Sequence, residues 1–358
     1  MVNLCNKCQE ILYRILTEQL GEKTFAKLYA RKEKCPIKRL RAVLQTAYVK
    51  RTLLRLYYTK DFEMQWNKLV QSATKGYCKI ESIDYSAAYW NTTIMHSCIG
   101  YILSALCHGY LPVVAVCSPQ GTNTWESFYR QPFLSAEYLA DSFSRQQVEE
   151  FPVWTLHYDA DIKMEVDKEK DKQCLQYWRN IYAKLAVLNT KTQEYVRCDE
   201  AAAFAQQDIN KCLGVLCRGT DYVARIPKNH FRQPPVEEML QKVERLYKEW
   251  NCTGIYLATE DGSIARQFKE RFPGKIVENK RTYYDDIYYG KKITAIADVH
   301  FNRENDDYYK GLEYLSSMYI LSHCAFLAAG RCGGTTFAQM VKNENWQGCF
   351  LFECGRYV

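Results

Sequence analysis

The stretch that decides the fold is Leu213–Pro227, "LGVLCRGTDYVARIP". Its first five residues form an apolar run typical of a buried strand, and Arg218 and Asp221 follow close to a glycine. Removing an arginine side chain from water costs free energy unless an anionic group meets it. The stretch therefore predicts a strand of an α/β sheet whose carboxyl end holds an anion.

Similar apolar runs return further along the chain. "GIYLAT" at 254–259, "KIV" at 275–277 and "AFLAA" at 325–329 are each predicted to be strands. Apolar stripes predict helices over 236–250, 263–272, 312–323 and 335–343. Strands that alternate with helices of these lengths predict a parallel, doubly wound sheet.

The first half of the chain carries a second set of alternating elements. The longest apolar run, 98–116, is interrupted by His108, Gly109 and Pro112, which favours a buried helix over 92–108 followed by the strand "LPVVAV" at 111–116, and not a membrane span. The stretch 281–309 is rich in Tyr and Asp and is predicted to be a mobile loop near a ligand, with a solvated loop as the default reading and a carboxylate metal site as a further alternative.

Length and charge suggest three segments. A chain of 358 residues that is 47% hydrophobic can build two cores, so we expect a first lobe over 76–205 and a second lobe over 206–358. The helical segment 1–75 precedes them, and its residues 1–60 hold 14 lysines and arginines against four glutamates. These basic helices either cover a neighbouring domain or contact an anionic membrane surface or acidic glycan. No nucleic-acid motif accompanies the charge, so no nucleic-acid partner is expected.

The cysteines and the N-terminus bear on location. The 16 cysteines are scattered, with one isolated CxxC at Cys5 and Cys8, which does not predict a zinc site. The first ten residues, "MVNLCNKCQE", contain no apolar signal region. We therefore expect a reduced, cytoplasmic protein, at most peripheral at the inner membrane face.

Polar residues follow three of the predicted strands. They are Arg218, Thr220 and Asp221 after the first, Glu260, Asp261 and Ser263 after the second, and Gly333, Gly334, Thr335 and Thr336 after the third. The carboxyl ends of parallel strands meet at one edge, and a glycine-rich turn that opens a helix favours an anion. The set suits a nucleoside diphosphate. Two alternatives stay open: Arg218 pairs with Asp221 alone, or the acids after the second strand cap the next helix.

Three segments, "GVLCRGTDYV", "IYLATEDGSIARQFKERFP" and "LSHCAFLAAGRCGGTTFAQMV", occur in that order after an upstream "NTWESFY". In this order they resemble the α1,6-fucosyltransferase family, with its nodulation-type bacterial relatives and the protein O-fucosyltransferases. The resemblance runs from about residue 85 to 341. It implies a GT-B-like fold of two Rossmann-type lobes with parallel sheets, and inverting transfer of fucose from GDP-fucose without a metal or other cofactor. A glycan acceptor, lipid-linked at the membrane, and a role in polysaccharide biosynthesis are the matching expectations.

The resemblance also assigns roles and departures. It implies that Arg218 binds the β-phosphate, that Asp221 holds the same loop, and that Glu260 and Asp261 lie beside the nucleotide. Leu216 stands where the family has a histidine, and Gly219 where it has a second arginine.

The general base of the α1,6 enzymes has no counterpart here, which leaves Asp84 and His230 as candidates. The alternatives are the same fold with another nucleotide sugar, or a non-catalytic glycan-binding or scaffolding protein.

Overall fold

The computed structural model describes residues 52–53, 55–80, 92–117, 122–133, 169–224, 230–290 and 296–357. The segment 1–75 was predicted to contain helices over 3–30 and 37–58. The first of these helices, most of the second, and Asp84 lie outside the described residues. Within the described residues, no helix combines the length and the apolar character that a membrane span requires.

The chain divides into two compact units. Unit 1 comprises Met1–Asp84, His96–Val116 and Gln131–Asn180, and unit 2 comprises Tyr85–Met95, Cys117–Arg130 and Ile181–Val358. The division of the sequence at 75/76 and 205/206 into functional lobes stays a prediction.

Unit 1 contains a two-stranded parallel sheet and a buried helix. Strand β1, Tyr77–Ile80, pairs with β2, Leu111–Val114, and Tyr77 lies opposite Leu111. Helix α5, Thr92–Cys107, ends just before β2, and its residues Ile102, Ala105 and Leu106 are fully buried. The predicted buried helix followed by a strand is thereby confirmed. The first residues of α5, up to Met95, belong to unit 2. Helix α4, Phe62–Gln71, lies in unit 1 and is capped by the Asp61 side chain.

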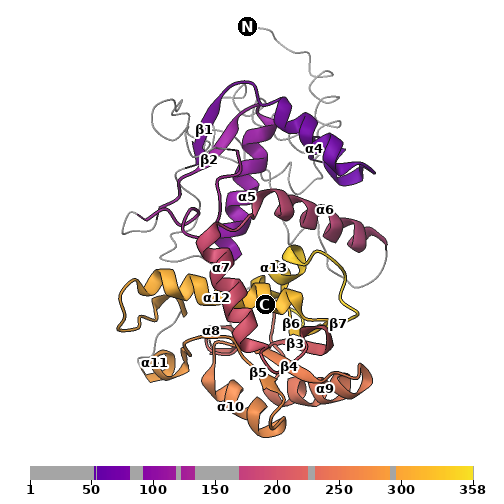
Figure 1. Ribbon diagram of the computed structural model, residues 1–358, viewed down its shortest axis with the longest axis vertical. Coiled ribbons are helices and arrows are strands. Elements are labelled where there is room, and N and C mark those ends of the chain that lie inside the picture. Colours follow the sequence, from indigo (N-terminus) through magenta and orange to yellow (C-terminus); the bar gives the residue numbers. More distant parts are fainter. Residues whose placement is uncertain are drawn as a thin grey trace, which may run out of the picture. The chain divides into compact units, whose positions relative to one another are not determined.

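The centre of unit 2 is a five-stranded sheet. Its strands are β3 (Cys212–Leu216), β4 (Gly254–Ala258), β5 (Ile276–Val277), β6 (Phe326–Gly330) and β7 (Gly348–Phe352). They lie in the order β5-β4-β3-β6-β7, and all neighbours are parallel (Figure 1). If these five strands are renumbered 1 to 5 along the chain, their order in the sheet is 3-2-1-4-5, which is typical of doubly wound folds. The predicted α/β class with a parallel sheet is confirmed.

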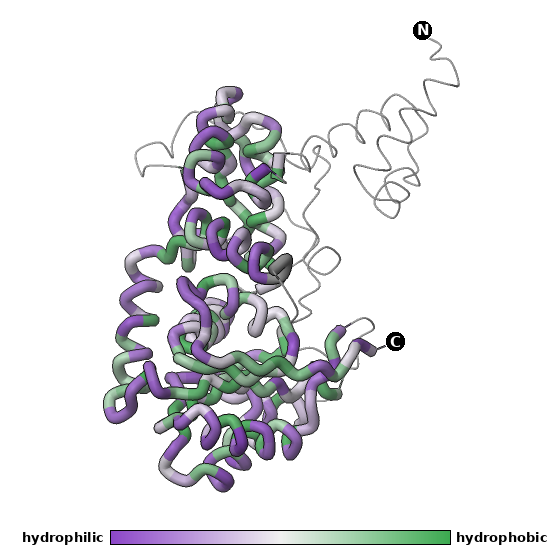
Figure 2. Tube along the Cα trace, turned by 90° about the vertical axis from the view of Figure 1, so that its right-hand side faces the viewer, coloured by the Kyte–Doolittle hydropathy of each residue, from purple (hydrophilic) through white to green (hydrophobic). Residues whose placement is uncertain are grey.

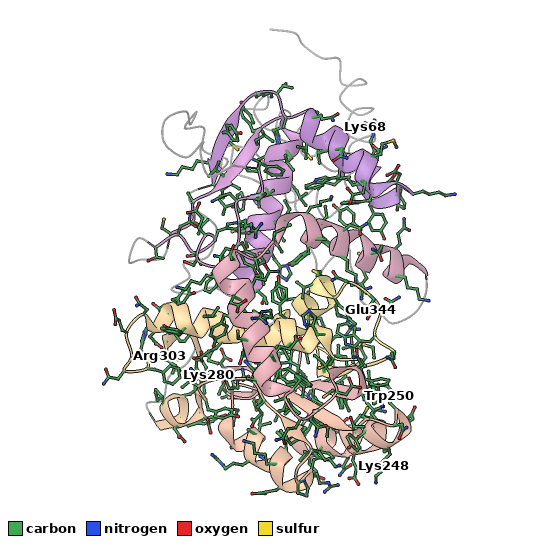
Figure 3. The ribbon with its side chains drawn as sticks, in the orientation of Figure 1. Lys68, Lys248, Trp250, Lys280, Arg303 and Glu344 are labelled. Carbon is green, nitrogen blue, oxygen red and sulfur yellow. The ribbon has the colours of Figure 1, made fainter. Side chains whose placement is uncertain are left out.

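Helices cover both faces of this sheet. On one face α9 (Val236–Glu249) and α10 (Gly262–Arg271) pack against the buried strand residues Leu213, Val215 and Leu257. Trp250, labelled in Figure 3, lies at the end of α9. It stacks on Phe326 of β6 with ring centroids 5.3 Å apart. The strands appear as a hydrophobic layer between more polar helices (Figure 2). The apolar stripe that predicted α9 is thus the stripe that meets the sheet.

The opposite face is covered by α12 (Asp306–His323), with α13 (Gly333–Val341) beside it. Gly214 of β3 lets α12 approach closely, because a Cβ at this position would lie 2.8 Å from Leu321 Cδ1. Buried Tyr256 of β4 donates a hydrogen bond to Asn279 Oδ1 over 2.8 Å. The remaining helices are α6 (Glu169–Leu185), α7 (Thr190–Ala203), α8 (Asp221–Ala224), α11 (Asp285–Gly290), and the 3₁₀ helices η3 (Ile209–Lys211) and η4 (Ile296–Asp298).

The stretch 281–309 differs from the predicted loop. It contains α11 and η4, and α12 begins at Asp306, six residues before the predicted start. The prediction was wrong because it treated the charged residues as solvated. Lys310 is fully buried and donates to the Val299 carbonyl over 2.8 Å, with the Asp307 carboxylate 2.9 Å away.

Candidate functional site

The doubly wound order places a switch point between β3 and β6. From β3 the chain continues to β4 and β5 on one side, whereas β6 and β7 lie on the other side. Leu216, the last residue of β3, lies opposite both Ala258 and Ala329. The loops that leave β3 and β6 therefore diverge, and such a crevice at the carboxyl edge is where ligands of open α/β sheets bind.

Arg218 follows β3 at this edge. Its Nε lies 3.1 Å from Glu260 Oε2, its Nη2 lies 3.4 Å from Asp221 Oδ1, and its side chain is 11% exposed. Burial acts to lower the pKa of the guanidinium, but Glu260, Tyr222 and Asp221 raise that pKa well above its ordinary value. Arg218 is therefore charged at any physiological pH. Its main partner is Glu260 from the neighbouring strand, so the alternative of pairing with Asp221 alone is wrong.

Glu260 fixes the backbone of the Arg218 turn. Its Oε1 accepts hydrogen bonds from the Gly219 N–H at 2.8 Å and from the Thr220 hydroxyl at 3.0 Å. Thr220 is fully buried and has φ of 45°, a left-handed conformation that a β-branched residue rarely adopts. The carboxylate thus holds a strained turn, a feature that clusters at functional sites.

Gly219 is required by close packing. A Cβ at this position would lie 2.8 Å from Asp261 Cβ and would overlap the Asp261 carboxylate. The second arginine that the resembling family carries here would therefore not fit.

Asp261 and Ser263 take the capping role that the sequence left open. Asp261 is the N-cap of α10, and its Oδ1 accepts from the Ser263 N–H at 2.9 Å and the Ile264 N–H at 3.2 Å. The Ser263 hydroxyl donates to the same oxygen over 2.7 Å. Their contact with a donor stays a prediction.

The N-terminus of α13 forms the other side of the crevice. A Cβ at Gly333 would lie 2.5 Å from Thr92 Oγ1, and one at Gly334 would lie 2.9 Å from Tyr314 Oη, so neither position has room for a side chain. Thr335 and Thr336 are buried, and the Thr335 hydroxyl donates to the Gly330 carbonyl over 2.6 Å. The first N–H groups of α13, which closely follows β6, have no partner within the helix.

Tyr222 connects the two sides. Its ring lies 4.4 Å from Arg218 Cζ, and the Gly333 N–H at the start of α13 acts to lower the pKa of its hydroxyl. Burial, followed by the neighbouring Cys332, raises the pKa of Tyr222 to about 12. Burial also raises the pKa of Tyr314, whose hydroxyl bonds with Thr92. The structure therefore brings Arg218 and the Gly333–Gly334 turn together at one place.

The remaining predicted site residues lie at the margin or outside. Asp221 Oδ2 accepts from the Ile296 N–H at 3.2 Å, which holds η4 to the Arg218 turn. His230 is exposed, and its ring centroid lies 6.2 Å from that of Tyr222. Asp84 lies outside the described residues.

The acidic residues of 281–309 have structural partners. Among the described residues one group, His300, Asp306 and Asp307, brings three ligand atoms within 4.8 Å of one another. The Lys310 side-chain nitrogen lies 3.5 Å from Asp306 Oδ2 and 2.9 Å from Asp307 Oδ1, and Arg303 Nε lies 2.7 Å from Asp306 Oδ1, so the two carboxylates already have cationic side-chain partners. Asp285 accepts from the Gly262 and Ser263 N–H groups at the start of α10.

Sequence reasoning missed Tyr222, Tyr314, Cys332 and Thr92 as neighbours of the crevice. Tyr222 had a local signal, since it follows Asp221 directly. Tyr314 lies in a helix and Thr92 lies more than a hundred residues upstream, and neither carries a motif.

No family model matches the chain, and no curated protein matches it. Among solved structures the chain is similar to a NodZ α1,6-fucosyltransferase soaked with GDP-fucose, with 14% identity over 75% of this chain and 93% of that chain and a TM-score of 0.40. It is also similar to fucosyltransferase NodZ from Bradyrhizobium (13% identity, 74% and 92% coverage, TM-score 0.38). A mutant of Arabidopsis thaliana FUT1 in complex with GDP matches with 9% identity, 91% and 82% coverage and a TM-score of 0.41.

Proposed function

We propose that the protein is a glycosyltransferase of the GT-B type that takes a sugar from a nucleoside diphosphate. The supporting observation is that Arg218 and the Gly333–Gly334 turn lie on the two sides of the switch point of a doubly wound sheet. A diphosphate requires positive charge and N–H donors, and these two features supply both.

The same two features serve the chemistry of sugar transfer. When the glycosidic bond breaks, the leaving diphosphate gains negative charge while the sugar becomes cation-like. A preorganised guanidinium and helix N–H groups stabilise that charge more in the transition state than in the ground state. Within the described residues the carboxylates engage Nε and Nη2 of Arg218, and a guanidinium has five N–H donors, so further donors serve the phosphate.

We propose fucose from GDP-fucose as the donor sugar, transferred with inversion to a glycan acceptor, and no metal or further cofactor. Inversion needs a base that takes the acceptor proton from the face opposite the diphosphate. His230 and Asp84 are the proposed candidates, and His230 lies next to Tyr222 at the edge of the crevice.

A second donor identity is supported by Leu216. This residue replaces the family's histidine, is buried, and packs beside Gly334, with its Cδ2 at 3.3 Å from the position of a Cβ there. An apolar side chain in this place cannot hydrogen-bond a base, so another nucleotide sugar is the alternative to GDP-fucose.

The test is a thermal-shift panel of GDP, UDP and ADP sugars, followed by donor hydrolysis with the best nucleotide. A nucleotide at 100 times its dissociation constant is expected to stabilise the folded chain by about 2.7 kcal/mol. Arg218→Ala is expected to lower turnover by a factor of about 100 or more. The matched control is Arg271→Ala, whose arginine is 43% exposed, pairs with Glu244 and lies at the C-terminal end of α10, whereas Asp261 caps the opposite end.

The proposal fails if no nucleotide stabilises the protein, or if Arg218→Ala turns over donor as fast as the control variant. Glycan binding without donor turnover would favour the non-catalytic glycan-binding alternative.

Location and acceptor are proposed together. A lipid-linked glycan at the inner membrane face would match a cytoplasmic protein whose basic residues 1–60 approach anionic lipid. If a variant with Arg39, Arg41, Arg51 and Arg55 neutralised sediments with phosphatidylserine vesicles as well as the native chain, this part of the proposal is wrong.

A further inference from the structure

Arg331 and Glu353 form an ion pair at the carboxyl ends of two neighbouring strands, β6 and β7. They directly follow Gly330 and Phe352, which lie opposite each other in the sheet. Arg218 is paired in the same way with a glutamate that follows the strand β4 beside it. The carboxyl edge of the sheet thus carries two arginine–glutamate pairs, one on each side of the switch point.

The two pairs differ in the exposure of their carboxylates. The Glu260 side chain is 8% exposed and also accepts from the Gly219 N–H, whereas the Glu353 side chain is 58% exposed. The guanidinium is mostly buried in both pairs, with 11% exposure for Arg218 and 12% for Arg331. An exposed carboxylate gains little from an ion pair, because water solvates it well. Glu353 can therefore leave its arginine at small cost, whereas Glu260 cannot.

The turn that carries Arg331 is fixed from two sides. Gln233 donates through Nε2 to the Arg331 carbonyl over 2.8 Å, and the Thr335 hydroxyl donates to the Gly330 carbonyl over 2.6 Å. The Arg331 guanidinium lies near the ring of Phe231, with 5.7 Å between Cζ and the ring centroid. A guanidinium that is already held in place loses little further freedom when it binds an anion.

Phe231 also brings a second guanidinium to this part of the sheet edge. Arg356 Cζ lies 3.8 Å from the centroid of the same ring, and the two residues face each other in an antiparallel bridge. Next to this bridge the Arg232 N–H donates to the Gly355 carbonyl over 2.9 Å. Two guanidinium groups near one ring concentrate positive charge at the carboxyl edge, which favours an anionic ligand.

We propose that Arg331 is a second oxyanion-binding residue, at which a phosphate or carboxylate group of a ligand replaces the Glu353 carboxylate. The present pair shows how the oxyanion binds, since Glu353 Oε1 accepts from Nη2 of the guanidinium. Phosphate and carboxylate oxygens use the same N–H donors of an arginine. The inference goes beyond the proposed function, because this contact does not depend on what the crevice at Arg218 binds. The oxyanion belongs either to a donor diphosphate or to an acidic group of the acceptor.

The expected effects follow from the competition between Glu353 and the ligand. The native affinity is lowered by the fraction of molecules in which the pair is formed. Glu353→Gln removes the competitor and should bind inorganic pyrophosphate about three- to fivefold more tightly than the native chain. Arg331→Gln removes the charged donor and should bind it about tenfold more weakly. The gain from Glu353→Gln should disappear when both substitutions are combined, whereas a general effect of the lost negative charge would persist.

The experiment is calorimetric titration of the full chain and these three variants with inorganic pyrophosphate, GDP and glucuronate. The matched control is Glu244→Gln, because Glu244 of α9 forms an exposed pair with Arg271 of α10. The control should bind all three ligands like the native chain. If Glu353→Gln binds none of them more tightly than the control does, or if its gain persists in the double variant, the inference is wrong.

The three ligands distinguish the two sources of the oxyanion. A gain for pyrophosphate, with or without GDP, assigns the oxyanion to a donor diphosphate, whereas a gain for glucuronate alone assigns it to the acceptor. Because Glu353 is exposed, Glu353→Gln is expected to fold, and its affinities alone can contradict the inference. If no nucleotide binds while glucuronate binding still depends on Arg331, the proposed function fails and this inference stands.

Discussion

At the residue scale, Glu260 does the most to shape the crevice. Its two oxygens meet the Arg218 guanidinium, the Gly219 N–H and the Thr220 hydroxyl, and its side chain is only 8% exposed. A buried carboxylate is stable only when it is paired in this way. The left-handed backbone of Thr220 depends on these bonds.

Glu260→Gln keeps the shape of the side chain but removes its charge. We expect the free energy of unfolding to fall by about 3 kcal/mol, because breaking a buried ion pair leaves Arg218 poorly compensated. Denaturant unfolding measures this. Glu244→Gln, in an exposed pair with Arg271 and Lys248, should leave the free energy of unfolding nearly unchanged, because solvent screens such pairs. Equal losses in both variants would contradict the role of Glu260.

Gly219→Ala tests the close contact between the two strand-end turns. The new Cβ would overlap Asp261, so we expect about 1 to 3 kcal/mol of destabilisation and a loss of nucleotide binding. Gly290→Ala is the control, since a Cβ there meets nothing within 4 Å. Nucleotide binding by Gly219→Ala at native affinity would show that the turn tolerates a shift.

The sequence could predict which residues gather at the sheet edge but not how they pair. Arg218, Glu260 and Gly333 each follow an apolar run, and parallel strands bring their ends together. The pairing of Arg218 with Glu260 depends on β3 and β4 being neighbours in the sheet. Glu260, which also accepts the Gly219 N–H, is 41 residues from that glycine, so local sequence does not reveal the contact. Tyr222 was not predicted as a site residue, because only the fold places its ring 4.4 Å from Arg218 Cζ.

At the scale of elements, strands were easier to predict than the start of α12. The runs around β3, β4 and β6 are fully buried, so apolar composition alone located them within one or two residues. The first turn of α12 buries Lys310 against Asp307, and no periodicity reveals a buried charge pair. The strand β7, "GCFLF", was not predicted; it lies at the edge of the sheet, and its first three residues are only partly buried or exposed.

Helix α10 offers a test that separates capping from donor binding. Asp261→Ala removes the N-cap and should lower the free energy of unfolding by about 1 kcal/mol, whereas Asp261→Asn keeps an acceptor and should leave stability nearly unchanged. If Asp261 also contacts the donor, Asp261→Asn will weaken nucleotide binding at native stability. Unchanged affinity in that variant would assign Asp261 to capping alone.

At the scale of the whole molecule, stability should depend on two histidines of α5. Burial lowers the pKa of His96 from 6.5 to about 4, and burial also lowers that of His108, although its Nδ1 lies 2.7 Å from the Ser104 carbonyl oxygen. Both rings are therefore neutral in the folded chain under conditions in which the unfolded chain begins to take up protons.

The sign of the pH effect follows from this difference. Between pH 6.5 and about 4 the unfolded chain binds a proton at His96 that the folded chain does not, so the free energy of unfolding falls as the pH falls. The slope reaches about 1.4 kcal/mol per pH unit for one such histidine. Thermal unfolding from pH 7 to 4.5 should show a shallower loss for His96→Gln than for the native chain, while His300→Gln, at an exposed position, should follow the native curve. Parallel curves for all three proteins would mean that His96 becomes protonated without unfolding, and that carboxylates alone set the acid limit of the fold.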